Sequence, residues 1–298
     1  ALKVVEADLV DQLRNATTAQ VCEVPLCEVQ FDHIVRGLDH VVQMEEHFGD
    51  LHCHFIVSEL ATGGDLLEAL KQRPGGLYER QAQALIRQAA KGLSSLHRRG
   101  LAMQDVSLEN MLLFVVGDGR WQVRLCDPGQ AVVVSFDSAT GAETPTPFHG
   151  FVGKQFRPPE LYSRSPYLAT KVDAWCLGWS TFFLLVARPM FHCADPEESD
   201  ADWALFDRKA FTKLFAQKGW RQTLSPQAKD FILRLMHVDP EARMSVRQAL
   251  QHPWLLEEQA SGAAAVQGAA SAACTGAPRA EACEASRAHG ADGEVLGQ

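Results

Sequence analysis

The sequence predicts an α+β protein in which a strand-rich segment, residues 1–60, precedes a larger and mainly helical part, residues 61–255. Two observations support this division. Short segments of strand character flank a tight turn at Gly49-Asp50. From Asp65 onward, apolar residues recur at intervals of three and four, as they do on one face of a helix. The length of 298 residues allows about one or two domains.

The first part is predicted to contain three strands and one helix. Residues 1–5 form a strand, and residues 44–48 and 53–58 form a hairpin around the turn. Residues 6–37 are polar at first and then helical. Because the chain begins inside a strand, we expect that the natural N-terminus lies upstream of Ala1.

The second part is predicted to be built from helices. The most regular pattern marks a long buried helix that ends at Gly100, and its apolar positions are Leu85, Ile86, Ala89, Ala90, Leu93 and Leu96. Further helices are expected at residues 170–190, 207–217, 225–237 and 245–254. The longest apolar run, residues 175–187, is shorter than the ~20 residues that a bilayer requires, so it indicates a buried helix and no membrane segment.

Composition limits the classes of function. A hydrophobic content of 46% and a charged content of 22% are typical of a soluble globular enzyme. The net charge of −9 argues against a nucleic-acid partner held by phosphate contacts. None of the eight cysteines has C-x-x-C or zinc-finger spacing. We therefore expect a reducing, intracellular location, most simply the cytoplasm.

The last segment, residues 256–298, differs in composition from the rest. Alanine, glycine, serine and glutamate dominate it, and aromatic residues are absent. Such a segment buries too little apolar surface to offset its chain entropy, so it is predicted to be disordered. An alanine-rich helix is the alternative, which the scattered glycines oppose.

Three side chains that can bind a cation or a proton flank a predicted hairpin. Asp105 and Asn110 precede its strands, residues 111–116 and 121–126, and Asp127 follows them. Because a hairpin reverses the chain, Asn110 and Asp127 should lie at the same end. Their oxygens are suitable ligands for a divalent cation. Asp105 is then placed to accept a proton from a hydroxyl group.

These two loops resemble the catalytic loop and the metal-binding loop of the protein kinases, whose patterns are H-R-D-L-x-x-x-N and D-F-G. Further kinase motifs follow in the family's order. They are the V-A-I-K strand at residues 1–3, the hinge at 58–61, the helix start at 63–66, the A-P-E element at 158–160, the D-x-W-S-L-G start of the central helix at 173–178, Arg243, and His252-Pro253-Trp254. The resemblance extends from residue 1 to about residue 255 and is closest to the calcium/calmodulin-dependent-like group of serine/threonine kinases. No EF-hand pattern follows, so calcium regulation has no support.

The resemblance implies a two-lobed fold with an active-site cleft between the lobes, and transfer of the γ-phosphoryl group of ATP to protein serine or threonine hydroxyls with Mg²⁺. Asp105 would be the catalytic base, and Asn110 and Asp127 would hold Mg²⁺. Lys3 would bind the α- and β-phosphates. The remaining nucleotide contacts would come from Ser58, Glu59, Ala61 and Leu112. Ser58 stands at the residue that guards the back of the adenine pocket, and its small size should admit bulky inhibitors.

The glutamate that normally pairs with the phosphate-binding lysine is not obvious. Alignment on Leu38-Asp39-His40 puts Phe31 at its position. Glu28 lies about one helical turn earlier, and Glu23 is a further candidate. If neither reaches Lys3, activity would be weakened or lost.

Other departures affect regulation and catalysis. Met103 and Gln104 replace the H-R pair, as in non-RD kinases, so activation should not depend on phosphorylation of the activation loop. Ser107 replaces a lysine that touches the γ-phosphate, and we hypothesise that Lys154 supplies this charge. Pro128 replaces the phenylalanine of D-F-G, which should make the loop switch less readily. The Gly-rich phosphate loop would precede Ala1.

Two functions therefore remain open. The departures at residues 31, 107 and 128 favour a pseudokinase that acts as a nucleotide-binding or scaffold module. The retained Lys3, Asp105, Asn110 and Asp127 favour an active serine/threonine kinase. Substrates would be proteins, with a mild preference for upstream basic residues near Asp65 and Glu109. We expect structural roles for Asp173, which would anchor the catalytic loop, and for a buried pair between Glu160 and Arg243.

Overall fold

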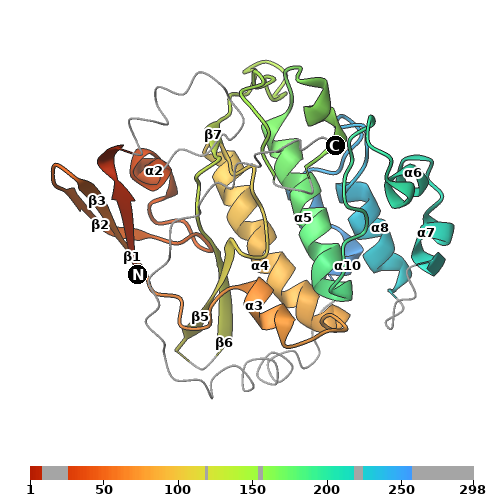
Figure 1. Ribbon diagram of the computed structural model, residues 1–298, viewed down its shortest axis with the longest axis horizontal. Coiled ribbons are helices and arrows are strands. Elements are labelled where there is room, and N and C mark those ends of the chain that lie inside the picture. Colours follow the sequence, from red (N-terminus) through yellow and green to blue (C-terminus); the bar gives the residue numbers. More distant parts are fainter. Residues whose placement is uncertain (9–25, 118–119, 154–156, 218–223, 257–298) are drawn as a thin grey trace, which may run out of the picture.

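The computed structural model describes residues 1–8, 26–117, 120–153, 157–217 and 224–256 (Figure 1). Within these residues, an N-terminal β-sheet with one helix lies beside a larger, mainly helical part, so the predicted α+β fold class is confirmed. The tail was predicted to be disordered, and its residues 257–298 lie outside the described residues.

The small sheet contains three antiparallel strands, β1 (Leu2–Glu6), β2 (Met44–Gly49) and β3 (Cys53–Ser58), in the order β1-β3-β2. Helix α2 (Cys27–Val35) lies against β2 and directs Cys27, Phe31 and Val35 into the core. The register places Lys3 opposite Ile56. Since directly opposed residues share a face of an antiparallel pair, Lys3 lies on the same face as Ile56 and Ser58.

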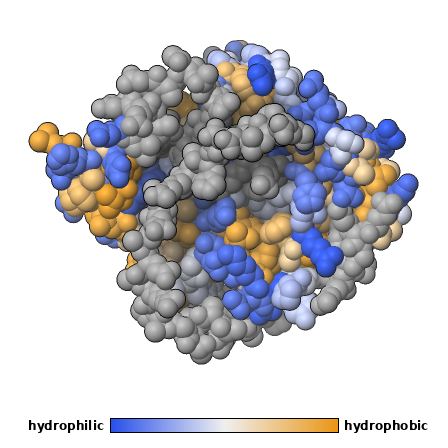
Figure 2. All heavy atoms as spheres, viewed as in Figure 1, coloured by the Kyte–Doolittle hydropathy of each residue, from blue (hydrophilic) through white to orange (hydrophobic). Residues whose placement is uncertain are grey.

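The other face of β1 carries Leu2 and Val4, which are exposed, and Phe48 of β2 is also exposed. Apolar residues are correspondingly visible over the sheet at the left of Figure 2. The alternation of apolar and charged residues in β1 therefore turns Lys3 toward the rest of the molecule.

The helical part is organised around α5 (Ala169–Val186), of which 15 of 18 residues are buried. This burial explains the long apolar run in the sequence. In the described part of the chain, no helix is long and apolar enough to cross a membrane. The other helices are α3 (Leu66–Lys71), α4 (Glu79–Arg98), α6 (Ala201–Asp207), α7 (Phe211–Gln217), α8 (Pro226–Leu235), α9 (Val246–Ala249) and α10 (Pro253–Leu256).

Three predicted helix boundaries were wrong. The helix expected at 207–217 is two helices, because Asp200 caps α6 and Lys209 has a left-handed backbone, with φ of +57°, that separates α6 from α7. Helix α5 ends at Val186 and not near residue 190, since Ala187 is also left-handed. The helix expected at 245–254 is divided before Pro253.

The predicted hairpin is confirmed. Strands β5 (Met111–Val116) and β6 (Arg120–Leu125) pair antiparallel, with Met111 opposite Leu125. Two short strands, β4 (Leu101–Ala102) and β7 (Val132–Val133), pair beside it, and a 3₁₀ helix, η2 (Pro159–Ser163), precedes α5. The loops at 103–110 and 126–131 therefore lie at the same end of the hairpin.

Candidate active site

Lys3 is paired with Glu28. Its Nζ lies 2.6 Å from Glu28 Oε1 and 3.7 Å from Asp127 Oδ1. The side chains of Lys3 and Asp127 are about 40% exposed, at 41% and 40%, whereas that of Glu28 is 19% exposed. The ammonium group of Lys3 in β1 thus contacts two carboxylates, one from α2 and one from the loop after β6.

The orientation of α2 explains why Glu28 and not Phe31 reaches the lysine. Phe31 and Cys27 face the core, and Glu28 lies in the first turn of the helix on the adjoining face. The Cys27 thiol donates to the carbonyl of Gly129 at 3.7 Å, which joins α2 to the loop that carries Asp127. The third candidate, Glu23, lies outside the described residues.

The loop after β6 has a backbone suited to its residues. Asp127 has a φ of +56°, in the left-handed region that aspartate tolerates better than most side chains. Its Oδ1 accepts a hydrogen bond from the amide of Gly129 at 3.2 Å. The amide of Cys126 donates to the carbonyl of Asn110 at 3.1 Å, so the two loops are joined where the metal ligands were predicted.

Asp105 and Asn110 contact each other within the loop at residues 103–110, here called the catalytic loop after the kinase motif that it resembles. Both are buried, and Asn110 Nδ2 donates to the Asp105 carbonyl at 3.0 Å and to Asp105 Oδ2 at 3.1 Å. Because the amide nitrogen is used in this way, the amide oxygen of Asn110 remains the atom that can coordinate a cation. The described residues contain no group of three or more histidine, cysteine or acidic side chains that could hold a metal. A cation here would therefore depend on this amide oxygen, on Asp127 and on ligands from outside the protein.

A buried carboxylate from α5 holds the start of this loop. Asp173 is fully buried and accepts hydrogen bonds from the amides of Met103, at 2.9 Å, and Gln104, at 2.6 Å. It also contacts His97 Nε2 at 2.7 Å. Gln104 has a φ of +61°, and the two hydrogen bonds from the amides to Asp173 stabilise this unusual backbone conformation.

The side chain of Gln104 connects the catalytic loop to the segment beyond β6. Its Nε2 donates to the carbonyl of Gln130 at 2.7 Å, and its Oε1 accepts from the hydroxyl of Tyr167. The side chain of Gln130 accepts from the amide of Gly153 at 3.1 Å. These neutral hydrogen bonds, here called the glutamine clasp, join Gln104 to Gln130 and Tyr167, and Gln130 to Gly153.

The predicted nucleotide-binding residues occupy the connection between the two parts. Ser58 ends β3, and its amide and carbonyl bond to the first residue, Ala1. The amide of Glu59 donates to the carbonyl of Gln43 at 3.2 Å. Burial would raise the pKa of Glu59, but hydrogen bonds from Arg124 and from the Gln43 amide outweigh it and lower the pKa. Glu59 therefore remains ionised and fixes the connection to β6.

Two further predicted residues lie nearby. Leu112 belongs to β5 and bridges to Asp65, at the start of α3. Ala61 lies in the connection between β3 and α3 and is half-buried. The structure does not describe Lys154, so its predicted role near Asp105 lies outside these contacts.

Comparison with known proteins agrees with this geometry. The family model described as "Protein kinase domain" matches residues 1–255. The chain belongs to the protein kinase family. Among its relatives are "Calcium/calmodulin-dependent protein kinase type 1" of Macrobrachium nipponense, 32% identical over 76% of this chain, and the protein of that name from Caenorhabditis briggsae, 34% identical over 74%. A "Serine/threonine-protein kinase H1 homolog" of Danio rerio is 31% identical over 81% of this chain.

The kinase domain spans only part of these relatives. The matches cover 62%, 58% and 53% of the lengths of the three proteins. The matches confirm, for the domain, the relation to the calcium/calmodulin-dependent kinases that the motifs predicted. The activity of the whole protein is a separate question.

Beside its site, the kinase domain carries a thiol of low reactivity. Burial raises the pKa of Cys126 to about 12, and the neighbouring charge of Asp127 adds to the effect. Cys126 therefore stays protonated at neutral pH and acts as an apolar side chain.

Sequence reasoning missed Gln130 and Tyr167, two members of the glutamine clasp. The loss of the arginine at residue 104 was visible in the sequence, but its replacement contacts lie 26 and 63 residues away. Glutamine and tyrosine carry no motif of their own here, so no local signal identified them.

Proposed function

We propose that this domain is an active, ATP- and Mg²⁺-dependent serine/threonine protein kinase. The observation that carries the proposal is the ion pair between Lys3 and Glu28, at 2.6 Å, with Asp127 Oδ1 at 3.7 Å from the same Nζ. The absence of a glutamate at residue 31 was one of three reasons to doubt activity, with Ser107 and Pro128. The ion pair with Glu28 weakens that reason, because it holds the Lys3 ammonium group in one position.

In this proposal ATP would supply the phosphoryl group, and Mg²⁺ would neutralise the charge that develops on it. Lys3 would bind phosphate oxygens. Asn110, through its amide oxygen, and Asp127 would hold the cation. Asp105 orients the substrate hydroxyl and accepts its proton, and the hydrogen bond from Asn110 Nδ2 to Asp105 Oδ2 fixes the orientation of its carboxylate.

Nucleotide recognition is proposed to involve the connection between the lobes. Because the Glu59 amide is already bonded to Gln43, backbone contacts to adenine would come from residues that follow it, such as Ala61. Leu112 would lie under the base, and Ser58 would leave space behind it. A domain of this kind works inside the cell, which the five free cysteines of the described chain support.

Activation without loop phosphorylation is part of the proposal and is supported by the glutamine clasp. Gln104 donates a neutral hydrogen bond to the Gln130 carbonyl and accepts one from the Tyr167 hydroxyl, and these bonds hold the segment that a phosphate would otherwise order. Tyr167→Phe removes one of these bonds and should increase limited proteolysis between residues 130 and 153. Phosphatase treatment of the wild-type protein should leave its activity unchanged. Activity that is lost after dephosphorylation would contradict this part.

Substrate preference is proposed to be mildly basic upstream of the target hydroxyl. Glu109 is exposed and can meet a basic residue. Asp65 contributes less, because its Oδ1 already accepts from the Glu68 amide at 2.8 Å as the cap of α3. A peptide array that shows no gain from upstream arginine would exclude the preference. Lys154→Ala tests the further hypothesis of a compensating charge, and unchanged phosphoryl transfer would exclude that role.

The deciding experiment measures γ-phosphate transfer from Mg-ATP to a mixed serine/threonine peptide pool by the full-length protein. Asp105→Asn serves as the control. Transfer that disappears in the control is the expected result. The second candidate, a pseudokinase, is favoured by Ser107 and Pro128. Nucleotide binding without any transfer would support it and refute the enzyme.

A further inference from the structure

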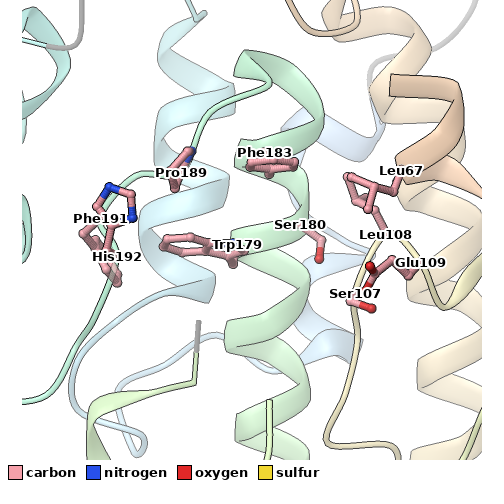
Figure 3. A pocket seen from close by; sticks show the side chains of 10 residues that line it. All are labelled: Leu67, Ser107, Leu108, Glu109, Trp179, Ser180, Phe183, Pro189, Phe191 and His192. Carbon is pink, nitrogen blue, oxygen red and sulfur yellow. The ribbon is translucent and has the colours of Figure 1, made fainter. Parts of the chain in front are cut away.

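A pocket of about 330 Å³ opens beside the catalytic loop (Figure 3). Its walls come from α3, from the loop before β5, from α5 and from the segment that follows α5. Ligand sites in proteins occupy roughly 300–1,000 Å³, so this pocket lies at the small end of the range. It suits one large side chain better than a whole cofactor.

Aromatic residues form the wall that α5 contributes. Trp179 and Phe183 of this helix line the pocket, and Phe191 lies to the left of Trp179 in Figure 3. The rings of Trp179 and Phe191 meet edge to face, with centroids 4.8 Å apart. Trp179 and Phe191 are buried, whereas Phe183 is half-exposed. The partly exposed ring of Phe183, supported by the buried rings, favours another flat, apolar group.

The wall after α5 is fixed before any ligand binds. Asp200, the cap of α6, accepts hydrogen bonds from the amides of His192 at 2.7 Å and Cys193 at 3.2 Å. On the other side, the Ser180 hydroxyl donates to the carbonyl of Val106 at 2.8 Å and joins α5 to the catalytic loop. A preformed pocket loses little entropy when it is filled.

The catalytic-loop side of the pocket is polar. Ser107 is buried, and its hydroxyl has no hydrogen-bond partner among the residues that the structure describes. Glu109 lies next to it in Figure 3 and is exposed. Solvent screens the Glu109 carboxylate, so its attraction for a cation is weak. A buried hydroxyl without a partner, by contrast, gains from an occupant that supplies one.

The pocket lies close to the proposed chemistry. Ser107 is two residues from Asp105, a separation of at most about 7 Å along the backbone. An extended polypeptide advances about 3.3 Å per residue. A segment that presents a hydroxyl to Asp105 therefore reaches the pocket with a residue a few positions away.

We propose that this pocket binds a tyrosine or tryptophan side chain of the substrate polypeptide. The ring packs on Trp179 and Phe183, and its hydrogen-bonding edge meets Ser107 and Glu109. The inference rests on the proposed function for the identity of the occupant. It assigns substrate selection to an aromatic contact in addition to the acidic residues Asp65 and Glu109.

The test is a binding measurement made without nucleotide, so its result does not depend on phosphoryl transfer. Fluorescein-labelled peptides carry one serine, with tyrosine, tryptophan, phenylalanine, arginine or alanine placed in turn at each of the neighbouring positions. Fluorescence anisotropy with the full-length protein gives each dissociation constant. At one position, the peptides with tyrosine or tryptophan should bind about tenfold more tightly than the alanine peptide. The phenylalanine peptide should have an intermediate affinity.

Variants identify the pocket as the source of this preference. Phe183→Ala should abolish the advantage of the aromatic peptides. The control Phe48→Ala, at an exposed phenylalanine on β2, should retain it. Ser107→Ala should bind tyrosine and phenylalanine peptides equally, and its small size change protects folding. The proposal is wrong if arginine binds best at that position, if phenylalanine equals tyrosine in the wild type, or if no residue exceeds alanine. These outcomes concern peptide binding alone, so the phosphoryl-transfer assay tests the enzyme activity independently.

Discussion

The buried pair between Glu160 and Arg243 allows a quantitative test of the fold. The Arg243 side chain is fully buried, and its Nη1 and Nη2 donate to the two oxygens of Glu160 at 2.6 and 2.9 Å. Removing one partner of a buried ion pair typically costs ~3–5 kcal/mol, because the other charge is left without its counter-ion. Glu160→Ala makes this change.

The structure places the expected cost at the low end of that range. Without Glu160, Arg243 keeps three carbonyl acceptors, those of His237 at 2.8 Å, Lys171 at 2.9 Å and Val238 at 3.3 Å. It also lies over the Trp175 ring, 5.0 Å from the centroid. The Glu160 side chain is 14% exposed, so water can enter when it is removed. We therefore expect a loss of ~3 kcal/mol in the free energy of unfolding.

Urea denaturation followed by circular dichroism measures this loss directly, and thermal melting should show a decrease of about 6–12 °C. Glu160→Gln keeps one acceptor oxygen and the shape of the side chain, so this variant should lose less free energy of unfolding. Glu46→Ala, at an exposed position, is the control and should change stability by less than ~0.5 kcal/mol. A loss below ~1 kcal/mol in Glu160→Ala would refute the account of an uncompensated buried charge.

Three further predictions concern the site and its supports. Glu28→Gln removes the charge that tethers Lys3 and should reduce phosphoryl transfer about tenfold without lowering the melting temperature, so an unchanged rate in a peptide assay would contradict the role of the pair. Burial opposes ionisation of Asp200, but backbone donors such as the Trp203 amide outweigh it and lower its pKa below 3.8. Ionised Asp200 therefore stabilises the fold above that value, and Asp200→Asn should cost ~1–2 kcal/mol at pH 7, a difference from wild type that shrinks in urea titrations as the pH falls below about 4. Cys126, with its pKa raised by burial to about 12, should remain unmodified by iodoacetamide at pH 8 while free glutathione reacts, and mass spectrometry that finds rapid alkylation would show that the thiol is not protected.

The kinase fold could be predicted because its evidence is local. Each motif is a short string, such as residues 105–110 or 173–178, and it can be read without knowledge of the tertiary structure. The hairpin of β5 and β6 followed from two apolar strands and a glycine turn. Helix ends were less predictable, since the left-handed residues Ala187 and Lys209 carry no special side chain.

The partner of Lys3 shows where local reasoning stopped. Three outcomes, Glu28, Glu23 or none, were compatible with the sequence. Packing of Phe31 and Cys27 into the core fixes the rotation of α2, and that rotation places Glu28 at 2.6 Å from the lysine. A helix can present either of two neighbouring faces, and only its tertiary contacts select one.

The glutamine clasp and the aromatic pocket were likewise decided by tertiary structure. The sequence by itself determined the family, the α+β division and the identity of the candidate catalytic side chains, because these depend on residues close together in the chain. Only the folded structure brought Gln104 to Tyr167 and Ser107 to Trp179 and Phe183. Such contacts join residues about 60 or more positions apart, and their geometry depends on how whole helices pack and not on the pattern within any one segment.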